Sequence, residues 1–190
     1  MEKRGHAQVS MEYVMIFAFI LIIIIPTAYV FRNYLRESAD TITLNRIDRI
    51  ARAMVDTGRE AYFTGPPFKS VIALEFPEQI DSMYVLDSKE SGSPEYFLMF
   101  NVLTASGTQA LFFESDVPVQ CYTSAANLCP EDPQLHEQCR VEGFHCYAFE
   151  GRDFSPGIKR MKVEANANCR FSEQVTATCV RLDEISDELT

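Results

Sequence analysis

The fold is decided by the stretch QVSMEY at residues 8–13 and by the apolar run VMIFAFILIIIIPTAYVF that follows it at residues 14–31. The run contains no charged residue. As a helix with a rise of about 1.5 Å per residue it measures roughly 27 Å, close to the thickness of a bilayer's hydrocarbon core, about 30 Å. We therefore expect residues 14–31 to form a transmembrane helix.

The polar stretch lies on the unusual side of the apolar run. An ordinary secretory signal peptide has its cleavage site after its apolar region, whereas here Lys3 and Arg4 come first, then the polar stretch, then the apolar residues. A cut before Gln8 would remove the charged leader, residues 1–7, and leave the apolar helix on the mature protein. The alternative is a signal-peptidase cut after Ala28, where the proline two residues earlier departs from the small-x-small pattern.

At these residues the chain resembles archaeal type IV pilins that carry class III signal peptides. Their pattern is Gln-x-Ser-x-Glu followed by an apolar stretch, and a prepilin peptidase cuts just before the Gln. This sequence supplies Gln8, Ser10 and Glu12, and Tyr13 after the glutamate is typical of the group. The resemblance is specific up to the end of the apolar run. It implies processing between Ala7 and Gln8, and as partners it implies a prepilin peptidase, an assembly ATPase and a polytopic membrane platform protein.

Glu12 is the carboxylate at the edge of the apolar run. Carried to the centre of a bilayer, a carboxylate costs on the order of 2–3 kcal/mol, although the macrodipole near a helix N-terminus offsets part of that cost. In the pilin family this glutamate is thought to pair with the N-terminal amine of a neighbouring subunit. The resemblance therefore implies that Gln8 and Glu12 dock subunits. The alternative is an interfacial glutamate in contact with water.

Beyond the membrane segment, the sequence predicts an amphipathic helix at about residues 42–63, in which charged residues occupy the face opposite the apolar ones. The apolar residues at helical spacing are Ile47, Ile50, Ala51, Met54, Val55, Ala61 and Tyr62. The sequence Gly-Pro-Pro at 65–67 cannot continue a helix. We expect one helix over residues 8–63, roughly 80 Å long. Its apolar first half suits the centre of a filament and its second half suits packing on a globular head.

The head, residues 64–190, has the pattern of a β domain. Short runs rich in β-branched and aromatic residues, mostly separated by Gly, Pro, Asp or Ser clusters, predict strands. These runs lie at residues 70–76, 82–86, 96–103, 109–114, 117–121, 145–149, 158–165 and 175–182. The predicted fold class is α+β: a long N-terminal helix followed by an antiparallel sheet or β-sandwich packed on its amphipathic half.

All cysteines lie in this head: Cys121, Cys129, Cys139, Cys146, Cys169 and Cys179. An even number confined to the part outside the membrane indicates disulfides. Sequence does not choose among the possible pairings. The arrangement we consider joins Cys121 to Cys146 and Cys129 to Cys139, closing the insertion 121–146, and joins Cys169 to Cys179. The alternative is a metal site built from Cys139, Cys146, His145 and His136, although no Cys-x-x-Cys pair is present.

Charge indicates orientation and the class of partner. Lys3 and Arg4 favour an N-terminus in the cytoplasm, which places everything after Phe31 outside the cell. The head carries 20 acidic and 9 basic side chains. An acidic exterior keeps a surface protein soluble and argues against nucleic-acid binding.

No catalytic motif is present: the sequence has no Gly-rich phosphate loop, no Gly-x-Ser-x-Gly and no His-Glu-x-x-His. We therefore expect no enzymatic activity and no cofactor. The sequence predicts a structural subunit of an archaeal type IV pilus-like surface filament, a self-assembling polymer with adhesion as one use. The alternative is a single-pass, membrane-anchored binding protein at the cell surface, and a minor or priming pilin lies between the two.

Overall fold

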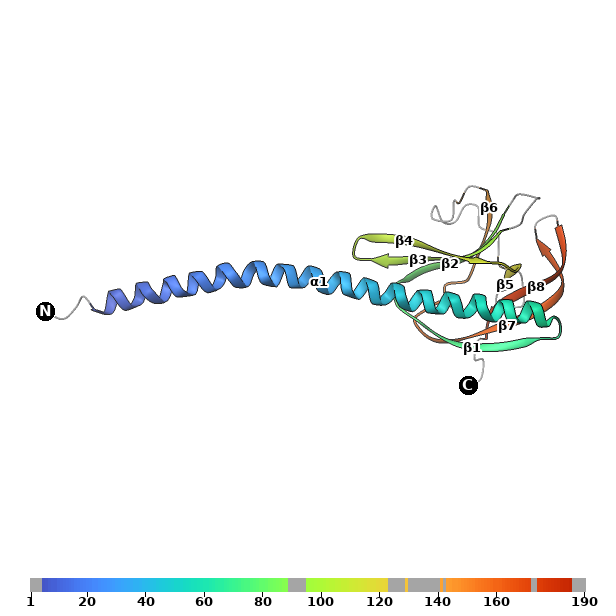
Figure 1. Cartoon of the computed structure of the whole chain (residues 1–190), viewed down its shortest axis with the longest axis horizontal. Coiled ribbons are helices and arrows are strands. Elements are labelled where there is room, and N and C mark those ends of the chain that lie inside the picture. Colours follow the sequence, from blue (N-terminus) through green and yellow to red (C-terminus); the bar gives the residue numbers. More distant parts are fainter. Residues whose placement is uncertain are drawn as a thin grey trace. The chain divides into compact units, whose positions relative to one another are not determined.

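A computed structural model describes the chain at residues 5–88, 95–122, 129, 141, 143–171 and 174–185. A single helix, α1, runs without a break from Gly5 to Thr64 (Figure 1). Residue contacts divide the chain into two compact units, an N-terminal unit (Met1–Ile42) and a head unit (Thr43–Thr190). Because the division falls inside α1, the last part of this helix belongs to the head unit.

In the N-terminal unit, α1 exposes every side chain from residue 11 to residue 37. The helix includes one segment that is long and apolar enough to cross a membrane, which agrees with the span expected at residues 14–31. Pro26 lies inside this segment. The hydroxyl of Thr27 donates to the carbonyl of Ile23 at 2.7 Å, so its polar atom is satisfied within the helix. This arrangement suits a helix that has no water around it.

The helix ends one residue beyond the predicted position. Gly65 has φ = 74°, a left-handed conformation that glycine adopts without steric cost, and its N–H donates to the carbonyl of Ala61 at 2.9 Å. Pro66 and Pro67 follow, and neither has an N–H with which to extend the ladder of helical hydrogen bonds. The Gly-Pro-Pro stop signal is therefore confirmed.

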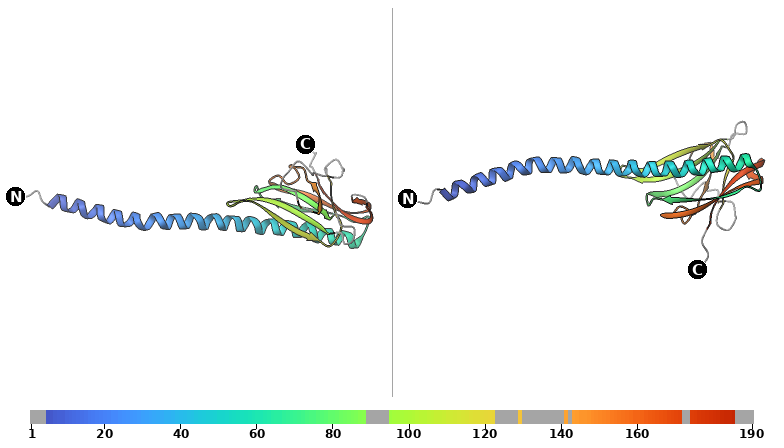
Figure 2. Two further views of the ribbon diagram at one scale, coloured as in Figure 1. Left: turned by 90° about the horizontal axis from the view of Figure 1, so that it is seen from above. Right: turned by 60° about the horizontal axis from the view of Figure 1, so that its bottom comes forward.

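Two four-stranded sheets build the rest of the head unit (Figure 2). In spatial order the first sheet contains β1 (Lys69–Phe76), β7 (Gly157–Phe171), β8 (Gln174–Glu184) and β5 (Val119–Tyr122). The second contains β4 (Gly107–Ser115), β3 (Tyr96–Thr104), β2 (Ile80–Ser88) and β6 (Phe144–Ala148). Each predicted strand is present, although β7 continues well past residue 165.

The expectation of a wholly antiparallel sheet is wrong at one pair. Strands β5 and β8 run parallel, while the other paired strands are antiparallel. The physical reason is a change of sheet: after β4 the chain leaves the second sheet, and the N–H of Val180 in β8 donates to the carbonyl of Pro118 at 2.8 Å. Strand β5 is thereby added at an edge of the first sheet, in the same direction as β8.

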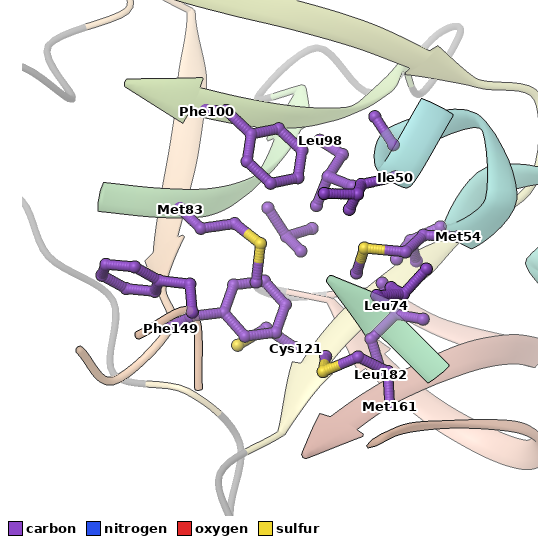
Figure 3. Close-up of a cluster of buried hydrophobic side chains, with 14 of the residues drawn as sticks. Ile50, Met54, Leu74, Met83, Leu98, Phe100, Cys121, Phe149, Met161 and Leu182 are labelled. Carbon is purple, nitrogen blue, oxygen red and sulfur yellow. The ribbon is translucent and has the colours of Figure 1, made fainter. Parts of the chain in front are cut away.

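The main core lies between the two sheets and α1. Apolar side chains of α1, of the first sheet and of the second sheet point into the same space (Figure 3). Ile47, Ala51 and Met54 are buried at the centre of the α1 stripe, as the helical spacing predicts, whereas Val55 and Tyr62 at its margin are only partly buried. The head segment of α1 is therefore a third wall of the core.

The structure corrects the disulfide pairing. Cys121 pairs with Cys129 and Cys169 with Cys179, at Cα–Cα distances of 5.4 and 5.8 Å. The expectation is confirmed for Cys169–Cys179 and wrong for Cys121 and Cys129. The chain returns beside β5 directly after leaving it, since the N–H of Cys129 donates to the carbonyl of Cys121 at 3.1 Å. Cys146 is also disulfide-bonded, and Cys139 lies outside the described residues.

Candidate functional site: the N-terminal helix and the surface of the head

The signal motif falls at the start of α1. Lys3 and Arg4 lie outside the described residues, and the helix begins at Gly5, so Ala7, Gln8 and Ser10 have helical backbone. Residues four apart in a helix share one face. Gln8 and Glu12 are therefore successive positions on the same face. The expected processing site and the docking roles of these residues stay predictions.

The side chains that follow the motif are exposed and apolar around the whole helix. Glu12 is exposed, and so is Tyr13, at 76%. The large apolar side chains exposed in this segment include Val14, Phe17, Phe19, Ile22, Ile23, Ile25, Val30 and Phe31. An apolar surface that surrounds a helix is stable only in a bilayer or inside a bundle of helices. The N-terminal unit therefore needs a partner from outside its own chain.

Among the described residues of the head unit, two of the grooves are lined by residues of α1. The larger, which we call the β4 groove, has a volume of about 530 Å³ and is lined by Arg52, Val55, Asp56, Arg59, Phe112, Phe113, Glu114 and Asp116. The smaller, which we call the β1 groove, has a volume of about 310 Å³ and is lined by Arg46, Arg49, Ile50, Ala73, Leu74 and Glu75. Both bring residues of α1 beside an edge strand, so both offer backbone and side-chain groups to a partner.

Ion pairs fix the positions of the two arginines that line the β4 groove. The guanidinium of Arg59 bonds both carboxylate oxygens of Asp116, with Nε 3.2 Å from Oδ1. This hydrogen bond holds the pKa of the Asp116 carboxyl below its ordinary value. Arg52 bonds Asp48, one turn earlier on α1, at 2.8 Å. These pairs are largely exposed and each contributes little to stability, but they fix where the charges lie.

A pair of carboxylates is buried elsewhere in the head. Asp153 is fully buried, and one of its oxygens, Oδ2, accepts a hydrogen bond from the N–H of Glu150 at 3.0 Å. Its other oxygen has no donor among the described residues. Glu184 is also buried, and its Oε1 lies 3.0 Å from Nζ of Lys159. Burial, and after it the neighbouring carboxyl group of Glu184, raises the pKa of Asp153 to about 7.

A second buried acid lies between the strands of the second sheet. Asp87 is 4% exposed and its register partners are Tyr96 on β3 and His145 on β6. Burial raises the pKa of Asp87 to about 6, and the nearby His145 opposes the rise. Neither Asp87 nor Asp153 stood out in the sequence. Nothing in the local pattern separates these acids from the many exposed ones, because only the tertiary fold buries them.

The residues described here do not assemble a metal site. Among them there is no group of three or more His, Cys, Asp or Glu side chains placed to hold a metal ion. Of the residues named for the metal alternative, Cys146 is disulfide-bonded, and His136 and Cys139 lie outside the described part of the chain. A disulfide sulfur is not available as a thiolate ligand.

Comparison with known proteins does not identify a relative. No protein-family model, no curated protein and no solved structure matches the chain. The chain's own features therefore carry the functional inference: the motif at residues 8–13, the exposed apolar helix and the disulfide-bonded head.

Proposed function

We propose that this chain is a structural subunit of an archaeal type IV pilus-like surface filament. The observation that carries the proposal is the continuity of α1: one helix joins a segment with an apolar surface on all sides to a head that has its own core. The motif Gln8-x-Ser10-x-Glu12, at the start of that helix, adds a sequence argument that does not depend on the fold. The role is structural rather than enzymatic.

Before assembly, the apolar segment anchors the precursor in the membrane. Lys3 and Arg4 keep the N-terminus in the cytoplasm, and the head lies outside, where its disulfides persist. A prepilin peptidase then cuts between Ala7 and Gln8. The cut removes the residues that hold the N-terminus in the cytoplasm but leaves the apolar helix intact.

Assembly transfers the helix from lipid to a bundle of identical helices. Lipid tails are as apolar as leucine side chains, so this transfer gains little from the hydrophobic effect. Close packing between helices and the neutralisation of charge must supply the preference for the bundle. Extraction from the membrane also needs a source of work, which fits the assembly ATPase and the platform protein as partners.

Glu12 supplies the neutralisation. After the cut, Gln8 carries a positive α-amine, one helical turn before Glu12. Within a bundle, the carboxylate of one subunit pairs with the amine of its neighbour and removes both charges from the apolar interior. Because a single axial offset between neighbours satisfies every pair, this contact also sets the register of the filament.

A membrane-anchored binding protein is the second candidate. A helix that is long and apolar enough to span a membrane is sufficient for anchoring alone, and loops on a rigid head can bind a ligand. This candidate requires neither removal of the leader nor contact between copies. It differs from the filament subunit in where the chain is found.

Isolation of shed surface material separates the two candidates. Cells that produce the chain are sheared, the released material is imaged by electron microscopy, and its subunits are identified by mass spectrometry. The filament proposal predicts thin filaments that contain this chain and that disappear when its gene is deleted. Recovery of the chain only from the membrane fraction would favour the anchored binding protein.

A further inference from the structure

The two grooves lie on the two flanks of the buried stripe of α1. At about 100° per residue, Arg46, Arg49 and Ile50 cluster on one side of the stripe, and Val55, Asp56 and Arg59 cluster on the other. The first set borders β1, an edge strand of the first sheet, and the second borders β4, an edge strand of the second sheet. Any copy of the chain therefore presents two different surfaces beside the same helix.

Unpaired charges of opposite sign mark these two surfaces. In the β1 groove, Arg46 and Arg49 have no acidic partner within 4.0 Å among the residues that the structure describes. Within the part of the chain that the structure describes, the hydrogen bond that Arg49 makes is to the backbone carbonyl of Asn45, at 3.4 Å. The β1 groove therefore carries two arginines without ion pairs beside one carboxylate, that of Glu75, so the charge of its lining is positive overall.

In the β4 groove the side chains without ion pairs are acidic. Arg59 bonds Asp116 and Arg52 bonds Asp48, so both of its arginines are already engaged. Its other carboxylates, Asp56 and Glu114, have no cation within 4.0 Å in the described part of the chain. The β4 groove therefore carries two acids without ion pairs.

An exposed aromatic ring accompanies the acids. Phe112, in the edge strand β4, lines the β4 groove and is 49% exposed. Across the helix, Ala73 of β1 lines the β1 groove and is exposed too. Aromatic side chains surrounded by charged groups are typical of residues that anchor protein interfaces. Phe112 and Ala73 thus give each surface an exposed apolar side chain beside its charges.

We propose that the β1 groove of one copy contacts the β4 groove of the next copy, with Arg46 and Arg49 facing Asp56 and Glu114. The proposal rests on the filament function and names the surface through which neighbouring heads meet. Two different patches make a heterologous contact, and such a contact repeats along an open helical filament when its rotation does not close.

The contact contributes to assembly by steering the heads together and fixing their register. Exposed complementary charges steer association and exclude wrong alignments more than they add affinity, and salt screens them. Assembly of the unmodified chain should therefore weaken as ionic strength rises.

Reversal and exchange of the charges test the contact in the full-length chain. One variant carries Arg46→Glu and Arg49→Glu, a second carries Asp56→Lys and Glu114→Lys, and a third carries all four substitutions. We expect filament yield, measured by electron microscopy of sheared material, to fall at least tenfold in the first two variants. We expect the third variant, in which the charges are exchanged, to recover most of the loss.

Matched controls separate the contact from general effects of charge and folding. Glu78→Lys and Arg152→Glu reverse exposed charges of the head outside both grooves and should leave the yield unchanged. Each variant is also extracted from the membrane, and thermal unfolding of its head is compared with that of the unmodified chain. If the arginine reversal destabilises the head, the neutral substitutions Arg46→Gln and Arg49→Gln are used in its place. We expect these to cause a smaller loss of filament yield.

Three results would count against the proposal. Normal yield from the reversal variants, or failure of the exchanged variant to recover, would overturn the contact and leave the filament function standing. Absence of filaments from the unmodified chain would overturn the filament function, and the contact with it.

Discussion

Two segments of α1 both carry apolar side chains that need to be shielded from water, but they differ in what can shield them. Residues 11–37 of α1 are exposed throughout and largely apolar, whereas in the head segment, from Thr43 onward, the apolar stripe is buried against the chain's own sheets. Ile23 is 65% exposed and Ile47 is fully buried, although they are the same residue type in the same helix. The comparison teaches where each segment's partner lies: inside the chain for the head segment, and outside it for the N-terminal unit.

Substitution of an isoleucine by alanine should therefore affect the stability of the head differently in the two segments. Ile47→Ala leaves a cavity in the core of the head and should lower its free energy of unfolding by about 2–5 kcal/mol. Ile23→Ala should leave head unfolding unchanged, because Ile23 lies in the N-terminal unit and its side chain is exposed. Thermal unfolding of the detergent-solubilised chain, followed by circular dichroism, measures both. Equal destabilisation by the two substitutions would mean that the segments are not independent.

Loss of the carboxylate at Glu12 should block assembly without affecting the head. Glu12→Gln leaves the amine of Gln8 unpaired in an apolar bundle, and breaking a buried pair from one side costs about 3–5 kcal/mol. We expect the variant to accumulate in the membrane as a processed, folded monomer with few or no filaments. Glu37→Gln, a carboxylate beyond the apolar run in the same helix, is the matched control and should assemble. Normal filament yield from Glu12→Gln, with processing verified, would favour the membrane-anchor alternative.

The cysteines provide a second test of the difference between the two units, because a change in them should affect the head alone. All of them lie outside the N-terminal unit, and we expect all to be oxidised in the native protein, so that alkylation without reductant labels none. Replacing Cys169 and Cys179 together by serine should lower the free energy of unfolding of the head by about 2–5 kcal/mol while membrane insertion stays normal. Free thiols accompanied by stoichiometric zinc would show instead that the metal alternative holds.

A smaller effect is expected from pH, again in the head alone. The pKa of Asp153 is raised to about 7 and that of Asp87 to about 6, so the folded state holds protons that the unfolded state releases near pH 4. Their stabilising contribution is complete below about pH 4 and disappears as pH rises through about 6 and 7. Each pKa unit corresponds to about 1.4 kcal/mol at most.

Urea unfolding between about pH 4.5 and 7.5 measures this dependence. Arg59 lowers the pKa of Asp116, and at Glu164 Lys69 and Lys162 lower the pKa against the opposing effect of burial. Above about pH 5.5 both acids are ionised in the folded and the unfolded chain, so they do not contribute to the slope there. Stability of the head should fall as pH rises, and Asp153→Asn should flatten the curve. A curve that rises across the window would contradict the raised pKa values of Asp153 and Asp87.

Much of the fold could be predicted from sequence because its signals are local. The helix ends where Gly65 takes the left-handed conformation and two prolines follow, and each strand overlaps a run of β-branched or aromatic residues, although β7 continues past its run. The buried positions of α1 follow from spacing alone, since Ile47, Ala51 and Met54 fall on one face. Local chemistry decides these features, so a single sequence contains them.

The features that were missed or mistaken depend on contacts distant in sequence. The parallel pairing of β5 with β8 arises because the chain changes sheet near Pro118, and the pairing of Cys121 with Cys129 follows from the return of the chain beside β5. The burial of Asp153 and the charges of the two grooves likewise appear only when strands and helix are packed together. No periodicity or spacing encodes them.

The mass of the subunit in isolated filaments tests the central claim most directly. In the proposed filament subunit, the apolar half of α1 stays on the processed chain, which begins at Gln8, and this half is used for assembly. Intact-mass analysis and N-terminal sequencing of filament subunits should therefore show loss of Met1–Ala7 and a chain that begins at Gln8. A subunit that begins at Tyr29, after a cut at Ala28, would have lost the assembly helix, and a full-length chain would retain its leader; either result would contradict the account.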